Sequence, residues 1–204
     1  MLNTQYLKGV DPTQDQWKQI AVMMKKHNHI PLFDAAYQGF ASGSLDLDAF
    51  PIRHFLENGF QMFVAQSYSK NMGLYGERIG ACHIVTKSKT TADNIMSQLK
   101  TLARINYLTP PMHGALIVHR ILSNPSYFKR WESEFSAIAG RIIKMRNLLR
   151  SELERLKTPG NWEHITNQIG MFSFTGLTEP QCTILIDECH IYMLKDGRIN
   201  MVRI

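Results

Sequence analysis

Apolar and polar residues follow two kinds of spacing along this chain. Apolar residues recur at helical spacing, between capping residues, prolines or glycines, over residues 11–29, 50–58, 90–104, 113–122, 125–157 and 179–188. Short runs rich in apolar residues occupy residues 30–33, 60–65, 81–86, 169–174 and 191–193. The first pattern predicts helices and the second predicts buried strands. Because the two alternate, the sequence predicts an α/β fold in which helices cover a largely buried sheet.

The longest helical stretch begins at Asn124-Pro125 and ends at Thr158-Pro159-Gly160. Its apolar residues form one stripe, which consists of Phe128, Trp131, Phe135, Ile138, Ile142, Met145, Leu149, Leu153 and Leu156. A stripe of this kind is typical of a helix that packs on a core, and not of a cofactor site. After the long helix come the strands predicted at 169–174 and 191–193 and the helix predicted at 179–188. Together they predict a small α+β unit. We therefore expect a domain boundary within the long helix, near residue 130.

The composition is that of an ordinary soluble globular protein. The chain has 204 residues, of which 44% are hydrophobic and 20% are charged, enough for a substantial core in one or two domains. No apolar run has the length of a membrane span, and the first residues lack the apolar core of a signal peptide. Cys82, Cys182 and Cys189 show no metal-ligand spacing with a histidine, so we expect reduced thiols and no metal site.

The chain is basic, with a formal net charge of +6. Its basic residues are interleaved with acidic ones, as in the segment RSELER at residues 150–155, instead of forming a dense stripe. This pattern argues against a nucleic-acid partner. An excess of positive charge favours small anionic ligands such as dicarboxylates, because it steers them towards the protein.

The residues most informative about function follow the second predicted strand. Lys70 stands in a short polar loop, with Ser67 three residues before it and Arg78 eight residues after it. An amine can form a Schiff base with an aldehyde, and a hydroxyl together with a guanidinium can hold a phosphate. This combination is what a pyridoxal phosphate (PLP) site requires. Outside such a motif, a loop lysine is usually an exposed surface residue.

A second polar position lies at the end of the first predicted strand, where Asp34 follows residues 30–33. Ligands of α/β sheets gather at the ends of the strands. We therefore expect Asp34 and Ser67–Lys70 to share one site. The alternative is that Asp34 caps a turn or a helix, which is the commoner role of an aspartate after a strand.

Several segments of the chain resemble the aspartate aminotransferases, which are class I PLP-dependent enzymes. They are residues 31–43 (PLFDAAYQGFASG), 67–80 (SYSKNMGLYGERIG), 170–177 (GMFSFTGL) and 191–199 (IYMLKDGRI). Family members are about twice as long, so the chain resembles their C-terminal half, from about Gly9 to about Ile199. The resemblance implies that residues 1–130 are the C-terminal part of the large PLP-binding domain, with a mixed, mainly parallel sheet. Residues 131–204 would form the small α+β domain, incomplete at its C-terminus.

The resemblance implies a cofactor site made of Asp34, Tyr37, Ser67, Ser69, Lys70 and Arg78. Lys70 would form the Schiff base with PLP and, once the substrate displaces it, would move the substrate's proton. Asp34 would keep the pyridine nitrogen protonated. Tyr37 would donate to the phenolate oxygen of the ring, although its alternative role is packing in a partly buried position.

The phosphate of PLP would bind to Ser67 and Arg78, because the planar fork of an arginine contacts two oxygens at once. Ser69 is a further candidate for the same cluster. The alternative for Arg78 is an ion pair with its neighbour Glu77, which would contribute little at a surface.

The resemblance also assigns the substrate contacts. Arg198 would pair with the α-carboxylate, and Arg104 would select the distal carboxylate of dicarboxylic amino acids and 2-oxo acids. In the family the second arginine comes from the neighbouring subunit, so a homodimer with a shared site is implied. Phe172 would pack near the substrate, or it could belong to the core of its apolar segment.

Some positions depart from the family pattern. Tyr6 stands where the family has an asparagine near the phenolate oxygen, and Leu108 and Thr109 replace a serine-asparagine pair. The N-terminal half of the family, with its phosphate cradle, ring-stacking aromatic residue and cross-subunit tyrosine, has no counterpart here. Residues Met1–Lys8 would then be sequence from an alternative transcript or a gene-model edge.

Two hypotheses follow from these observations. In the first, the chain is an aspartate aminotransferase that transfers the amino group between aspartate and 2-oxoglutarate, giving oxaloacetate and glutamate. In the second, it is a catalytically incompetent fragment that serves at most as a dimerisation partner. A third, an altered substrate choice, rests only on Leu108 and Thr109. The chain as given would be cytoplasmic, or mitochondrial if it belongs to a longer precursor.

Overall fold

The computed structural model describes residues 9–202 of the chain. In its first part, the strands β1 (Leu32–Ala35), β2 (Met62–Ser67) and β3 (Gly80–Val85) form a sheet in that order. β1 runs parallel to β2, and β3 runs antiparallel to β2. In the second part, β4 (Phe172–Phe174) and β5 (Arg198–Asn200) form an antiparallel pair. The expected α/β fold with a mixed sheet is confirmed.

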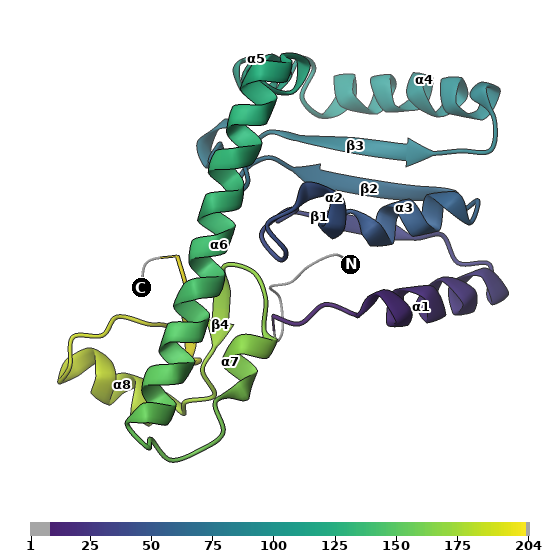
Figure 1. The fold of residues 1–204 in the computed structure, drawn as a ribbon. Coiled ribbons are helices and arrows are strands. Elements are labelled where there is room, and N and C mark those ends of the chain that lie inside the picture. Colours follow the sequence, from purple (N-terminus) through teal and green to yellow (C-terminus); the bar gives the residue numbers. More distant parts are fainter. Residues whose placement is uncertain (1–8, 203–204) are drawn as a thin grey trace.

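Helices surround both sheets. They are α1 (Gln14–Lys26), α2 (Leu45–Asp48), α3 (Phe50–Glu57), α4 (Lys89–Asn106), α5 (His113–Ser123), α6 (Pro125–Arg155), α7 (Glu163–Asn167) and α8 (Glu179–Asp187), with the 3-10 turn η1 (Tyr75–Glu77) between β2 and β3. Figure 1 shows that α6 runs past the edge of the larger sheet and continues beside the smaller one.

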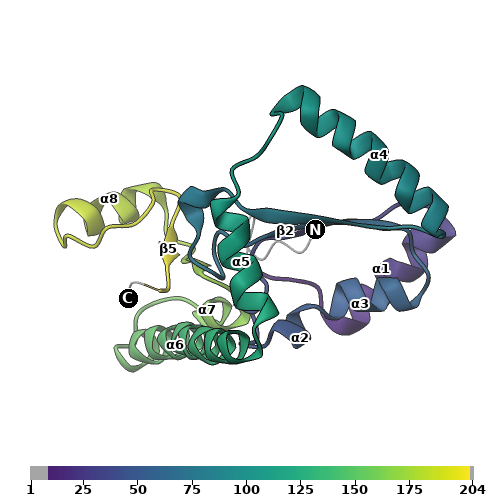
Figure 2. The same ribbon diagram turned by 90° about the horizontal axis from the view of Figure 1, so that it is seen from above.

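One face of the larger sheet is covered by α1 and α3 (Figure 2). Thr13 begins α1 with a capping box, because its hydroxyl accepts from the Gln16 backbone N–H and the Gln16 side chain accepts from the Thr13 backbone N–H. Trp17 of α1 and Phe55 of α3 pack on Phe33 of β1, with ring centroids 6.0 and 5.1 Å from it. Burial of each such ring contributes roughly 1.5–3 kcal/mol.

The opposite face of this sheet is exposed to solvent in the described residues. Along β2, buried and exposed side chains alternate, and Phe63 is exposed between the buried Met62 and Val64. Leu32 of β1 is 62% exposed. Helix α4 lies on this side (Figure 2), and none of its residues is buried. An apolar face of this kind is characteristic of a surface that another element or chain covers.

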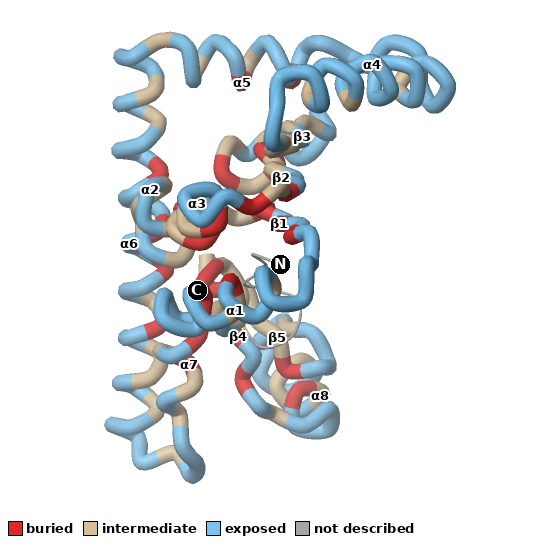
Figure 3. The backbone as a smooth tube through the Cα atoms, turned by 90° about the vertical axis from the view of Figure 1, so that its right-hand side faces the viewer, coloured by how far each residue is buried: buried red, intermediate tan, exposed pale blue. Residues whose placement is uncertain are grey.

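Helix α6 connects the two parts of the molecule. It begins at the N-cap Asn124, whose Oδ1 accepts from the backbone N–H of Ser126 and Tyr127, and Pro125 suits the first helical position. Its residue Phe135 packs edge-on against Phe40 with ring centroids 4.6 Å apart. Figure 3 shows buried residues at intervals along α6, interspersed with exposed ones. Two of the buried residues of α6, Phe135 and Ile142, form a second core with Phe40 and Met201.

The predicted elements agree with the structure, except that the short helices α2 and α7 were not predicted and that the last strand was misplaced. Predicted helices match observed ones to within three residues at each end, and β1 and β2 begin two residues later than predicted. The strand predicted over 191–193 is wrong: this segment has no regular structure, and β5 at 198–200 pairs with β4 instead. Ile191 and Tyr192 are 52% and 82% exposed, so their apolar character did not indicate burial. The predicted division near residue 130 falls inside the unbroken α6 and stays a prediction.

Within residues 9–202, no helix combines the length and apolar character that crossing a membrane requires. All three cysteines are free thiols, as predicted.

Candidate active site

The loop that carries Lys70 is fastened to the rest of the protein on both sides of the lysine. Ser69 and Asn71 are buried, at 2% and 6% exposure. The indole N–H of Trp131 in α6 donates to the Asn71 carbonyl at 3.0 Å. Lys70 itself is half-buried, so its backbone is fixed while its amine stays accessible.

Tyr37 lies beside the Lys70 amine. The distance from Lys70 Nζ to the centroid of the Tyr37 ring is 5.1 Å, within the range of a cation–π contact. The parallel register aligns Asp34 with Ala65, one residue before the end of β1, so the carboxyl ends of β1 and β2 lie at one edge. The structure thus brings the Asp34–Tyr37 segment and the Lys70 loop together, as the sequence predicts.

Asp34 projects from the face of the sheet that α1 and α3 leave exposed. Its neighbours Phe33 and Ala35 are buried on the opposite face. Asp34 lies within β1, and not in a turn or a helix cap, so the alternative role of a capping aspartate is wrong. Its carboxylate is open to a ligand placed over this edge of the sheet.

Ser67 ends β2 before the Lys70 loop, and Arg78 follows η1, two residues before β3 begins. Ser67 is opposite Gly80 in the β2–β3 ladder, and its Oγ accepts from the Ser69 backbone N–H at 3.2 Å. Arg78 is exposed, has a left-handed backbone with φ 48°, and donates to the Tyr75 carbonyl at 3.2 Å. The alternative ion pair with Glu77 does not form, because Glu77 pairs with His113 at 3.0 Å.

A second cationic group stands on the smaller sheet. The guanidinium carbon of Arg198 in β5 lies 5.2 Å from the centroid of the Phe172 ring in β4. Arg198 Nε is buried without a hydrogen-bond partner among the described residues. A stacked guanidinium with an unused buried donor fits a carboxylate ligand.

Arg104 is distant in sequence from Lys70 and from Arg198, and it lies on an exposed part of the fold. It lies near the end of α4, and its side chain is exposed. Figure 1 shows α4 at the opposite end of the molecule from β4 and β5. The structure does not bring Arg104 to Lys70 or Arg198 within this chain, and its role across a dimer stays a prediction.

The chemistry of these side chains fits PLP. The residues that carry an amine, a carboxylate, a phenol, a hydroxyl and a guanidinium lie on or beside the strand ends at one edge of the larger sheet. Next to Lys70, Asn71 Oδ1 is buried without a hydrogen-bond partner among the described residues, so this edge retains an unused polar atom. Burial also raises the pKa of the neighbouring Tyr68, so this phenol stays protonated at neutral pH.

Two polar clusters near the site were not predicted. Gln66 accepts from Tyr68 and contacts His83 at 3.2 Å, while its amide donates to Gln38 at 2.8 Å. Asp48 accepts from the loop after Tyr37, receiving hydrogen bonds from Gly39 N at 2.7 Å and from Ser42 Oγ at 2.6 Å. No sequence pattern indicates either cluster. Gln38, Gln66 and His83 are far apart in the sequence, and the partners of Asp48 belong to an ordinary loop.

A cavity of about 150 Å³ lies beside the Tyr37 segment, lined among others by Asp11, Trp17, Tyr37 and Asp48. Neither Lys70 nor Arg198 lines it, so it is adjacent to the candidate site and is not the site itself.

Comparison with known proteins decides the family. The model of the aminotransferase class I and II family matches residues 8–203. The chain belongs to this family. Among curated aminotransferases, it is 51% identical over 193 residues to the cytoplasmic aspartate aminotransferase of Gallus gallus, covering 95% of this chain and 47% of the relative. It is 54% identical over 193 residues to the chloroplastic aspartate aminotransferase 3 of Arabidopsis thaliana, covering 95% of this chain and 43% of the relative.

The fold of the aminotransferases is shared as well. The aromatic-amino-acid aminotransferase of Burkholderia pseudomallei, covalently bound to pyridoxal phosphate, superposes with a TM-score of 0.95 at 38% identity, over 100% of this chain and 51% of that one. The chain therefore spans about half the length of the relatives that it matches. Because the curated relatives include a cytoplasmic and a chloroplastic form, family membership does not select a compartment.

Proposed function

We propose that this chain carries the lysine and the carboxylate-binding residues of an aspartate aminotransferase. The reaction is the PLP-dependent, reversible transfer of an amino group between aspartate and 2-oxoglutarate, which gives oxaloacetate and glutamate. The observation that carries the proposal is the placement of Lys70. It is held on a fastened loop at the carboxyl ends of β1 and β2, with its amine 5.1 Å from the Tyr37 ring.

PLP, when bound, supplies an aldehyde to the lysine and an electron-accepting ring. In this role Lys70 Nζ would take the proton from the substrate Cα and carry it to the cofactor carbon C4′, which requires an amine held at a fixed place. Asp34 would hold the ring nitrogen and Tyr37 the phenolate oxygen, while Ser67, Ser69 and Arg78 would hold the phosphate. The exposure of Arg78 and its lack of an ion pair with Glu77 support this assignment.

Substrate recognition depends on two arginines at opposite ends of a dicarboxylate. Arg198 binds the α-carboxylate, and its stacking on Phe172 and its unpartnered buried Nε support this role. Arg104 binds the distal carboxylate from a second copy of the chain, so the functional unit is a homodimer. The exposure of α4 and its distance from β5 along the fold support a contribution across an interface.

Borohydride reduction of the chain after incubation with PLP tests the proposal. The pyridoxyl group should attach to Lys70, and peptide mass spectrometry locates it. Lys70→Ala and Lys70→Arg should both remove the label, since an arginine keeps the charge but does not form a Schiff base under these conditions. Lys87→Ala, at an exposed lysine after β3, is the matched control and should leave labelling unchanged. Preferential labelling of another lysine would contradict the assignment.

A second candidate function is that of a non-catalytic dimerisation partner. The observation that favours it is the exposed apolar surface formed by β1, β2 and α4, which includes Leu32, Phe63 and Met96. A surface of this kind associates with another chain or aggregates. Sedimentation of the purified chain, with and without PLP, separates a defined dimer from aggregates and monomers.

A further inference from the structure

Arg146 is a buried arginine that the proposed chemistry does not use. It lies in α6 and is 3% exposed. Its guanidinium donates to the carbonyls of Ile165 at 2.8 Å, Gly170 at 3.0 Å and Phe172. Its Nε has no hydrogen-bond partner among the described residues. Burial lowers the pKa of this guanidinium to about 10, so it remains charged at neutral pH.

The three carbonyls belong to segments that lead into β4. Ile165 lies in α7, Gly170 in the connection that follows, and Phe172 is the first residue of β4. Arg146 thus ties this main chain to α6 at three points. A methionine would fill a similar volume without burying a charge. The guanidinium adds a planar fork of donors, which fixes the carbonyls relative to one another.

Phe172 connects Arg146 to the carboxylate-binding arginine. Its carbonyl accepts from Arg146, and its ring supports the guanidinium of Arg198, whose Cζ lies 5.2 Å from the ring centroid. Phe172 pairs with Asn200 in the β4–β5 ladder, so Arg198 contacts it diagonally. A rotation of the peptide at Phe172 would therefore move the surface on which Arg198 rests.

We propose that Arg146 is a positioning residue for carboxylate recognition: it fixes the main chain of Phe172 and thereby sets the direction of the Arg198 guanidinium. This inference rests on the proposed function, in which Arg198 receives the substrate α-carboxylate. Arg146 touches neither substrate nor cofactor in this role and acts through Phe172.

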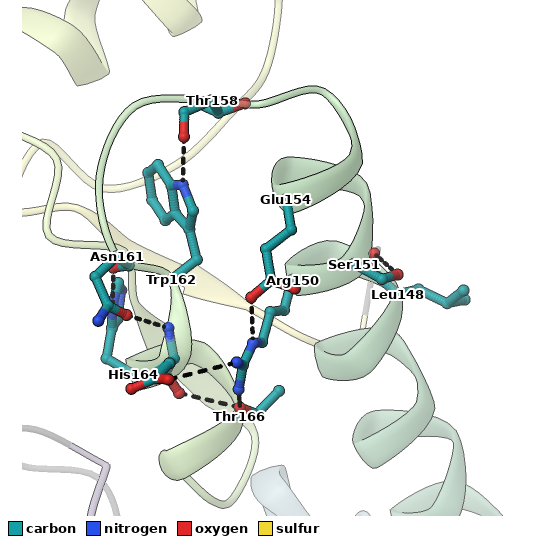
Figure 4. Close-up of polar contacts among 10 residues, drawn as sticks. Leu148, Arg150, Ser151, Glu154, Thr158, Asn161, Trp162, His164 and Thr166 are labelled. Carbon is teal, nitrogen blue, oxygen red and sulfur yellow. Dashed lines mark hydrogen bonds and ion pairs between the residues drawn. The ribbon is translucent and has the colours of Figure 1, made fainter.

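Arg150 provides a matched control. It lies one turn further along α6 and contacts α7 through Thr166 Oγ1 at 2.8 Å, while its Nε donates to Glu154 at 2.7 Å (Figure 4). It resembles Arg146 in fastening α7 to α6, but its hydrogen bonds reach no carbonyl of β4.

The first measurement is the NMR shift of the Arg198 side-chain protons in the 204-residue chain, because stacking on the Phe172 ring moves them upfield. Arg146→Lys keeps the charge but loses the fork, and Arg146→Met loses both. Both variants should reduce the upfield shift towards the value in Phe172→Leu, and Arg150→Met should retain it. If the shift survives in Arg146→Lys while the melting temperature falls, Arg146 has a structural role only and the inference is overturned.

The second measurement is the affinity of the chain for maleate, a dicarboxylate probe, followed by the same NMR signals. Arg146→Lys should weaken binding roughly tenfold, as coupled neighbours do, and Arg150→Met should not. If Arg198→Lys binds maleate as well as the unaltered chain, the proposed function fails. If Arg198→Lys weakens binding but Arg146→Lys does not, only the inference about Arg146 fails. The ring shift decides the role of Arg146 even where maleate does not bind.

Discussion

At the scale of single residues, arginines of this chain differ in burial and in partners, and these differences separate their roles. Arg146 is enclosed and donates to main-chain carbonyls. Arg198 is half-buried and stacks on Phe172, and its Nε has no partner among residues 9–202. Arg104 is exposed near the end of α4. Under the proposed function, the same charge would serve architecture in Arg146, ligand binding in Arg198 and a contact outside this chain in Arg104.

The two proposed substrate arginines should differ in which substrates they affect. In a chimera that joins this chain to the N-terminal half of the Gallus gallus relative, Arg104→Ala should lower kcat/KM for aspartate far more than for aromatic amino acids. Arg198→Ala should lower it for every amino acid, because all carry an α-carboxylate. Losing one charge-assisted pair costs about 2–4 kcal/mol, or roughly 30- to 1,000-fold. Equal losses for both substrate classes in both variants would refute this division.

Asp11 should make stability depend on pH. Burial, and then the nearby charge of Asp48, raises its pKa from 3.8 to about 6. Because the pKa in the folded protein lies above the unfolded value, the folded state binds more protons between pH 3.8 and about 6. Stability therefore falls as the pH rises through this window and levels off above it, by about 2–3 kcal/mol at most. Asp11→Asn should flatten the dependence in urea unfolding.

Asp15, in the first turn of α1, is the control for this measurement. It is exposed, and its hydrogen bond to Lys18 lowers its pKa, so its contribution has the opposite sign. Asp15→Asn should leave the fall in stability caused by Asp11 in place. If stability still falls with rising pH in Asp11→Asn, another group causes the fall and the prediction is contradicted.

At the scale of elements, the strand pairing places the chemistry. Parallel pairing of β1 with β2 puts the Asp34–Tyr37 segment beside the Lys70 loop, and antiparallel pairing of β2 with β3 puts Ser67 opposite Gly80. Helix α6 then contacts the Lys70 loop through Trp131 and the start of β4 through Arg146. One rigid element thus holds both proposed binding regions.

Gly80 is the position where this pairing tolerates no side chain. A Cβ at Gly80 would lie 2.5 Å from the Gln66 carbonyl oxygen, which is backbone and cannot turn aside. Gly80→Ala should therefore displace the ladder opposite Ser67 and cost roughly 1–3 kcal/mol, as overpacking does. The urea unfolding midpoint measures this effect. Gly76→Ala is the control, since a Cβ there meets nothing within 4 Å. Similar midpoints in the two variants would contradict the prediction.

At the scale of the whole molecule, two cores are joined by α6, and one face of the larger sheet remains exposed. The candidate site is assembled from one edge of that sheet, so the groups proposed to hold PLP come from one side only. The matched region covers only 47% of the Gallus gallus enzyme, so that relative is about twice as long as this chain. The arrangement of this chain thus supports the binding of PLP and substrate more clearly than it supports catalytic turnover.

The chain alone should therefore be a poor enzyme. PLP held from one side is not fixed in orientation, and a misplacement of about 1 Å costs roughly 100-fold in rate. We expect weak PLP binding and aspartate transamination near background, measured as oxaloacetate formation by the soluble 204-residue chain. Turnover within about tenfold of a typical 10 per second would show that these residues suffice.

The sequence by itself determined the longer helices, the α/β character and the family, and it supplied the candidate residues that lie in local motifs. These features are encoded locally: caps, apolar spacing and a lysine with its flanking serine and arginine lie within a few residues of one another. It also predicted that Asp34 and Lys70 belong to one site, because the ends of sheet strands share an edge.

Only the tertiary structure decided what depends on residues far apart in the chain. It placed β5 at 198–200, because pairing with β4, and not apolar character, selects a short strand. It paired Glu77 with His113 instead of Arg78, since α5 comes close to η1. It buried Arg146 against carbonyls from Ile165 to Phe172. The physical reason is the same in each case: pairing, burial and charge neutralisation are set by distance in space, which a local pattern does not record.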